Sequence, residues 1–267
     1  RGSAQVFARN VRAADVYQDD NATQDNCCAL VEGANSGLRA WNCEFACVGQ
    51  DVTASGSVIG GVRVSGAGAV AELYTSLTFG YAAAPGQLAC GVHVEEGGAK
   101  TSACALKGQL ASATQSGAAA GAIATTGASS SVITGGTCEA VISGALTASL
   151  GMAAAAFGGA AQALTLAGVT CTVTRQAGAD ASRAGVGISQ LAGADLRVID
   201  SVWPALTTAP ARLGGTGGAY AAEGVLGDGV RFPAAAGALL SGQTLWVDAA
   251  SPDATDTRTG LSNYDRS

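Results

Sequence analysis

Glu95 and Glu96 are the only neighbouring carboxylates between Gly61 and Ala184, so they are the first residues to test for catalysis. A glycosidase needs an acid and a second carboxylate that face each other across the scissile bond, and a lyase needs a base with cationic stabilisation. Adjacent residues of a strand point to opposite faces, so this pair lines one groove only where the strand bulges. We interpret Glu95 and Glu96 as part of a solvated turn and keep catalysis as the alternative.

His93 is the only histidine of the chain and lies between Val92 and Val94. If those two valines point into a core, strand alternation turns His93 outward, as an ordinary surface residue rather than a general base. No Ser/His/Asp or Cys/His grouping can be assembled around it from the local sequence. Because no second histidine is present, a zinc site has weak support, and we predict neither a metal site nor a cofactor.

The segments that must position these residues repeat along the chain. A glycine followed by β-forming residues returns in steps of 30, 30, 30 and 34 residues. A Gly-Ala pair follows each of these glycines a few residues later, so two markers share one period. Such a period is typical of a solenoid, in which each unit buries its apolar face against its neighbours. The repeated glycines are Gly61, Gly91, Gly121, Gly151 and Gly185.

The repeating units contain short strands rather than helices. No unit offers a long glycine-free run with apolar residues at helical spacing. Instead, apolar residues stand two apart, as in Val62 and Val64 or in Leu164 and Leu166, between clusters of Gly, Ser, Thr and Asn. This pattern predicts an all-β chain that folds as a single-stranded, right-handed parallel β-helix with a repeat of about 30 residues.

The coil is expected to span residues 26–247 in about seven rungs, where a rung is one full turn of the solenoid. Residues 1–25 are predicted to form an entry segment or cap, and residues 248–267 a C-terminal tail, because solenoid ends must be polar or covered. The step after Gly185 is long, so residues 207–222 are interpreted as an inserted loop outside the core. The candidate binding residues of that loop are Thr207, Arg212 and Tyr220.

Composition and charge narrow the classes of function. The chain of 267 residues has a net charge of -6 and a pI near 4.7, which argues against a nucleic-acid partner. No apolar run is long enough to insert into a membrane, and no signal peptide opens the chain, so a soluble protein is expected. Only 13% of the residues are charged, which leaves a bland surface on an elongated molecule and favours an oligomer.

The eight cysteines could form disulfides, bind zinc or fill the core. Cys104, Cys138 and Cys171 fall in the middle of successive rungs, where inward side chains would pack above one another. We therefore predict that most cysteines are buried, reduced thiols. A bridge from Cys47 to Cys43 or to Cys27 is the alternative.

The repeated Gly-Val-x-Val, the following Gly-Ala pair and the small-residue strands resemble the right-handed parallel β-helix proteins of tailed bacteriophages, such as tail fibres, tailspikes and virion decorations. The resemblance spans roughly residues 26–247. It implies a non-enzymatic virion structural protein that serves in assembly and host attachment. It also implies a homotrimer that contacts other virion proteins and a polysaccharide or receptor of the host surface, assembled in the host cytoplasm and exposed outside the cell.

Two other functions share this architecture and stay open. Depolymerase tailspikes of the same family cleave polysaccharides as glycosidases or lyases, with clustered carboxylates on a groove or between subunits. For that function the catalytic candidates here are Glu95, Glu96 and His93. Bacterial surface adhesins share the Ala/Gly/Ser-rich coil, although a secretion signal and few cysteines are expected of them. Fold alone does not decide among these classes.

Overall fold

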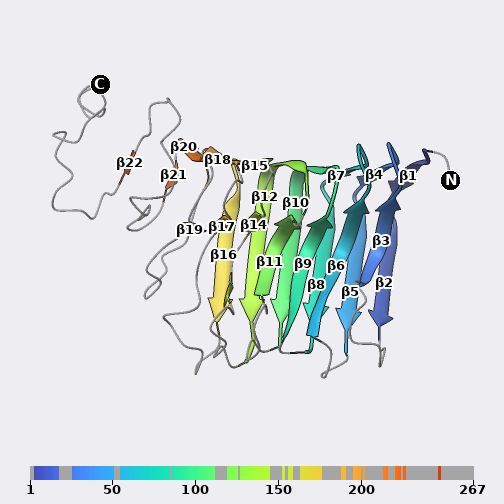
Figure 1. The fold of residues 1–267 in the computed structure, drawn as a ribbon, viewed down its shortest axis with the longest axis horizontal. Helices are drawn as coiled ribbons and strands as arrows, with labels where there is room; N and C mark the ends of the chain where they lie inside the picture. The colour runs from blue at the N-terminus through green and yellow to red at the C-terminus, as the bar shows by residue number, and fades with distance from the viewer. Residues whose placement is uncertain are drawn as a thin grey trace.

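The computed structural model is an all-β chain whose strands pair in parallel and stack into an elongated solenoid (Figure 1). The part of the chain that it describes contains no helix, and hence none long and apolar enough to cross a membrane. The described residues are 3–17, 26–50, 55–84, 86–111, 119–125, 127–144, 152–153, 156–158, 163–175, 188–190, 195–199, 201, 213–215, 220–223, 225–226 and 246–247.

Three ladders of parallel strands run along the solenoid, and we name them faces A, B and C. Face A contains β1 (Gln5–Arg9), β4 (Gly37–Trp41), β7 (Val70–Tyr74), the first halves of β10 (Gly98–Leu110) and β12 (Ser130–Ile142), β15 (Ala163–Ala167), β18 (Asp195–Ile199) and β20 (Tyr220–Glu223). Face B contains β2 (Arg12–Tyr17), β5 (Glu44–Gly49), β8 (Leu77–Ala82), the second halves of β10 and β12, and β16 (Thr170–Arg175). Face C contains β3 (Asn26–Glu32), β6 (Ser55–Ser65), β9 (Gly86–Val94), β11 (Ala119–Thr125), β13 (Met152–Ala153), β14 (Ala156–Gly158), β17 (Ile188–Gln190) and β19 (Leu213–Gly215). A separate pair is formed by β21 (Val225–Leu226) and β22 (Trp246–Val247).

The chain visits faces A, B and C in order, so one strand from each face makes one rung. The strands from β1 to β11 make about four rungs, and the ladder of face A continues through β12, β15, β18 and β20. β1 and β2 already pair with β4 and β5, so the ladder begins at Gln5 rather than at the predicted residue 26. The first strands therefore belong to the coil itself, although residues 1–25 are predicted as a cap.

The segment predicted as an inserted loop, residues 207–222, also contributes strands. β19 pairs with β17 on face C, and β20 pairs with β18 on face A. The structure thus differs from the prediction because short stretches rich in small residues fit a narrow ladder as well as they fit a loop. Tyr220 is the first residue of β20, whereas Thr207, Arg212 and residues 248–267 lie outside the described residues.

Inward positions alternate along the strands and carry small aliphatic side chains. The residues predicted to point inward on face C, Val62 and Val64 on β6 and Val92 and Val94 on β9, are all fully buried. They form one core cluster with side chains of the other two faces, among them Leu73 of face A. The prediction of inward alternation is confirmed at these positions.

The register of face C corrects the alignment that the glycine marker predicts. Val62 pairs with Val92, in agreement with the 30-residue step. Val92 then pairs with Ile123 rather than with Ala122, and Gly121 pairs with Cys90. The marker identifies the strand, but it misplaces its register by one residue, because the connection before β11 holds one residue more than the connection before β9.

A column of residues with left-handed backbone forms the corner between faces A and B. Each member follows the last ladder residue on face A, and the φ angles lie between 47° and 62°. Glycine adopts this conformation freely and asparagine adopts it with little strain, which explains the types found here. Two asparagines stack at the start of the column, since Asn42 Nδ2 donates a hydrogen bond of 2.9 Å to Asn10 Oδ1. The column consists of Asn10, Asn42, Thr75, Ala103, Gly135 and Gly168.

Thiols and hydroxyls follow this corner and satisfy its backbone groups. The amide of Cys43 donates to Ser76 Oγ over 3.0 Å, and the amide of Ser76 donates to Cys104 Sγ over 3.4 Å. The Ser76 hydroxyl in turn donates to the carbonyl oxygen of Tyr74 over 2.8 Å. A buried N–H without an acceptor is costly, so these side chains stabilise the corner beyond their apolar contacts.

The cysteines are core residues in the structure. All eight are free, and six of them are buried, as predicted for most of them. Cys138 and Cys171 are directly opposite in the ladder between β12 and β16. Their mutual contact and burial raise the pKa of Cys171, while burial and the neighbouring charges of Asp15 and other thiols raise the pKa of Cys47 to about 12.

Thiol labelling of the native chain at pH 8 is expected to modify few cysteines. The thiolate is the reactive form, and a raised pKa combined with burial keeps its concentration and its accessibility low. We expect a disulfide reagent to reach Cys27 and Cys28, which are partly exposed, before the six buried thiols. Denaturation should release all eight. Equal, rapid labelling of every cysteine in the native chain would contradict the buried positions.

Candidate functional site

The residues predicted as catalytic candidates do not form an acid and base pair. Glu95 and Glu96 lie in the bend between β9 and β10, outside any strand, and Glu96 is exposed. Arg63 Nη2 donates to Glu95 Oε1 over 2.6 Å. His93 is only 2% exposed, so the prediction that it points to solvent is wrong. The reason is that β9 is buried on both sides, with Leu88 its only partly exposed residue.

The surroundings of Glu95 favour its charged form. Burial acts in the opposite direction, but hydrogen bonds from Ser65 and Arg63 outweigh it, and the charges of Arg63 and His93 add to them, so the pKa of Glu95 is lowered. A general acid for glycoside cleavage needs a raised pKa. The Glu95 carboxylate is therefore suited to an ion pair rather than to proton donation.

Other carboxylates of the ladders are paired with cations one rung away. Arg12 Nε lies 2.9 Å from Glu44 Oε2, and Lys107 Nζ lies 3.2 Å from Glu139 Oε2. Each cation is directly opposite its carboxylate in the ladder, so the pair favours that register over a slipped one. Among the described residues, no group of His, Cys, Asp and Glu is arranged to hold a metal ion.

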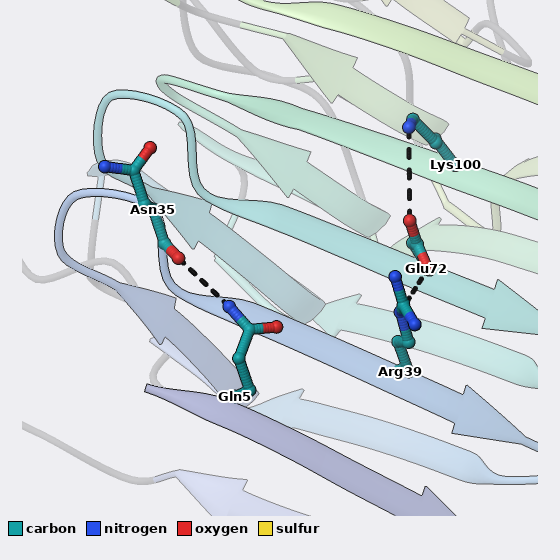
Figure 2. Close-up of polar contacts among 5 residues, drawn as sticks. All are labelled: Gln5, Asn35, Arg39, Glu72 and Lys100. Atoms are coloured by element: carbon teal, nitrogen blue, oxygen red, sulfur yellow. Dashed lines mark hydrogen bonds and ion pairs between the residues drawn. The ribbon is translucent and has the colours of Figure 1, made fainter. Parts of the chain in front are cut away.

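Glu72 lies between two cations on the outer side of face A (Figure 2). Its carboxylate oxygens are 2.6 Å from Arg39 Nε and 3.9 Å from Lys100 Nζ. The guanidinium of Arg39 also lies 6.0 Å from the centroid of the Phe7 ring. These four side chains are opposite one another in the ladder and form one row across β1, β4, β7 and β10. We call them the charged row.

Aromatic rings stand beside the charged row on the same face. Trp41 on β4 and Tyr74 on β7 are opposite each other, and their rings stack with centroids 5.3 Å apart and planes 9° apart. Trp41 is 37% exposed, and Phe7 on the preceding strand β1 is 66% exposed. Single exposed apolar residues are ordinary, but several on neighbouring strands mark a binding surface. We call Phe7, Trp41 and Tyr74 the aromatic surface.

A shallow pocket opens where the aromatic surface meets the corner between faces A and B. Its apolar wall comes from Phe7 and Trp41, and its polar groups are one guanidinium, two amides and one hydroxyl. A few polar groups that converge on an apolar wall are typical of ligand sites. The pocket is lined by Phe7, Ala8, Arg9, Asn10, Trp41, Asn42 and Thr75.

A second depression lies near the other end of the face A strands, where β7, β10 and β12 begin. Lys100 lines it and also contacts Glu72, so the charged row leads from the first pocket towards the second. The depression is otherwise made of small and polar residues, which leaves its floor open to an elongated ligand. It is lined by Ala67, Gly68, Val70, Glu96, Gly97, Gly98, Lys100, Ala128, Ser129 and Ser130.

The groups on face A suit a carbohydrate. A sugar ring presents C–H groups on its face and hydroxyls around its rim. The C–H groups pack on an aromatic ring, and the hydroxyls exchange hydrogen bonds with amides, carboxylates and guanidinium groups. The aromatic surface, the two corner asparagines and the charged row supply these partners side by side.

The sequence-based candidates do not include this surface, although the chain carries a signal for it. Trp41 and Tyr74 are 33 residues apart, close to the repeat, so a periodic coil brings them to neighbouring strands of one face. Asn10 and Asn42 repeat in the same way. A search for like residues one repeat apart would have found both pairs.

Comparisons with protein-family models, with curated proteins and with solved structures found no match. The function of the chain is therefore inferred from its fold and from the groups on face A.

Proposed function

We propose that this chain is a non-enzymatic attachment protein that binds a surface glycan along face A. The observation that carries the proposal is the exposed aromatic surface, bordered by Asn10, Asn42 and the charged row. Neighbouring strands lie about 4.8 Å apart, so a solenoid presents binding groups at a regular spacing on a rigid frame. A linear glycan can then contact several rungs at once, and weak contacts to single sugars add up.

The state of the carboxylates supports binding rather than cleavage. Glycoside hydrolysis requires two carboxyl groups on opposite sides of the scissile bond. Glu44, Glu72 and Glu95 each lie within hydrogen-bonding distance of an arginine instead. Ionised, paired carboxylates accept hydrogen bonds from sugar hydroxyls, so Glu72 on face A contributes to recognition without acting on the glycosidic bond.

The proposed setting is the virion of a tailed bacteriophage, as the resemblance of the repeat to phage β-helix proteins implies. In that setting the coil is right-handed and extends to about seven rungs. It assembles as a homotrimer with other virion proteins and is exposed outside the cell. The outer side of β8 supports an oligomer, because Leu77 is 40% exposed and Phe79 and Tyr81 lie on the same side of that strand. Apolar side chains on an outer sheet face suit contact between subunits.

A binding and cleavage assay on intact bacterial polysaccharides tests the proposal. Capsular and lipopolysaccharide glycans are immobilised as a panel, and the wild-type chain is expected to be retained on at least one of them. Prolonged incubation with that glycan should release no oligosaccharide, and the protein should sediment with the mass of three chains. Loss of retention across the whole panel would contradict attachment. Release of defined oligosaccharides, abolished in Glu95→Gln or Glu96→Gln, would establish a depolymerase.

A further inference from the structure

Arg9 is the exception to the way this chain handles its cations. Among the residues whose side chains the structure describes, the other basic groups lie 2.6 to 3.9 Å from a carboxylate oxygen. Arg9 is exposed and has no carboxylate at such a distance among the described residues. The paired cations are Arg12, Arg39, Arg63, Lys100 and Lys107.

The ladder explains why Arg9 lacks a carboxylate. Arg12 and Arg39 each face a glutamate directly opposite on the next strand, namely Glu44 and Glu72. The residue opposite Arg9 is Trp41. An aromatic ring therefore occupies the position that holds a carboxylate elsewhere, and the guanidinium lines the pocket beside that ring.

We propose that the pocket binds a sugar that carries a carboxylate, such as a hexuronic or sialic acid unit of a polysaccharide. The inference rests on the proposed function and names the class of glycan that face A takes. The guanidinium of Arg9 binds the carboxylate, for which its planar donors are well suited. Trp41 packs against the sugar ring, and the amides of Asn10 and Asn42 bind its hydroxyls. No carboxylate lines this pocket, so nothing there repels an acidic sugar.

The net charge of -6 does not oppose this assignment. Charges farther away than about 10 Å are largely screened at moderate salt, so the local guanidinium dominates the field inside the pocket. Hydrogen bonds to charged groups stabilise complexes more than neutral ones do. Partial exposure reduces the effect, and we expect the Arg9 contact to change affinity roughly tenfold.

The test uses the retained polysaccharide of the panel in two forms, native and with its carboxyl groups chemically reduced to alcohols. Affinities are measured for the wild-type chain, Arg9→Gln and Arg12→Gln. Arg12 is the matched control, because its removal changes the net charge equally and it lies outside the pocket. Wild type should bind the native form roughly tenfold more tightly than the reduced form. Arg9→Gln should lose that preference, whereas Arg12→Gln should keep it.

Each other outcome has a definite meaning. Equal wild-type affinity for native and reduced polysaccharide overturns the acidic-sugar assignment and leaves glycan attachment standing. Arg9→Gln that weakens both forms by the same factor also overturns it, because Arg9 would then act on the fold or on neutral groups. Retention of no polysaccharide in either form contradicts the proposed function itself.

Discussion

Gly80→Ala is expected to destabilise the coil by about 3 kcal/mol, which lowers the melting temperature by roughly 6–12 °C. Gly80 lies on β8 and faces β6 and β9 across the narrow interior. A Cβ atom at this position would collide with the carbonyl oxygens of Ile59 and Cys90. Both obstructing atoms belong to the backbone of paired strands, so neither can rotate away as a side chain would. The measurement is thermal unfolding followed by circular dichroism.

Gly37→Ala is the matched control for this prediction. It is also a strand glycine, but the atoms nearest to an added Cβ belong to the flexible end of the Gln5 side chain. Its melting temperature should stay within roughly 2 °C of wild type, or rise slightly, because alanine restricts the unfolded chain. Equal destabilisation by both substitutions would mean that general strand propensity, and not backbone contact, explains the glycines. The column of Gly80 also contains Cys47 and Ala140, so an unchanged Gly80→Ala chain would show that the coil widens freely at every rung.

The part of the fold that was predictable from the sequence is the part that a single periodicity determines. Alternation along a strand depends only on neighbouring residues, so Val92 and Val94 could be assigned to the interior with confidence in the physics. Register depends on the length of each connection as well. One additional residue before β11 shifts Ile123 into the place expected for Ala122, and the glycine spacing contains no trace of that shift.

Burial of both sides of a strand is equally invisible to alternation. His93 occupies an outward position by the pattern, yet it is buried because β9 is covered on both sides. The candidate site was missed for a related reason. Trp41 and Arg9 are far apart in the chain, and only the ladder places them opposite each other. A single-repeat motif therefore identifies strands, whereas a binding surface appears when residues one repeat apart are compared.

The corner between faces A and B shows the same limit from another direction. The glycine-rich turns were expected, but the corner begins with asparagines and is followed by thiols and hydroxyls that bond to backbone groups. Composition identifies cysteine as a small core residue. It does not indicate that Cys104 accepts a hydrogen bond from the amide of Ser76, since that role depends on the rung above it.

Trp41→Ala is expected to weaken glycan binding about 30-fold or more, which corresponds to about 2 kcal/mol. Trp41 supplies the largest exposed wall of the pocket and is held in place by stacking on Tyr74. A rigid aromatic ring buries much area at a low cost in side-chain entropy, so its truncation removes most of the packing for a sugar ring. Trp41→Phe should retain part of the affinity, because the smaller ring still offers an apolar face. Affinities are measured on the glycan retained by the wild-type chain.

Leu30→Ala is the matched control, because Leu30 is an exposed large apolar residue on the neighbouring face C and lies outside the pocket. It should leave affinity within about twofold of wild type, as expected for a residue that touches no ligand. Thermal unfolding of both variants separates binding from folding, since loss of the Trp41–Tyr74 stack alone lowers stability by about 1 kcal/mol. If Trp41→Ala binds the glycan as tightly as Leu30→Ala does, the aromatic surface is not the binding site. The glycan would then have to contact another face of the coil.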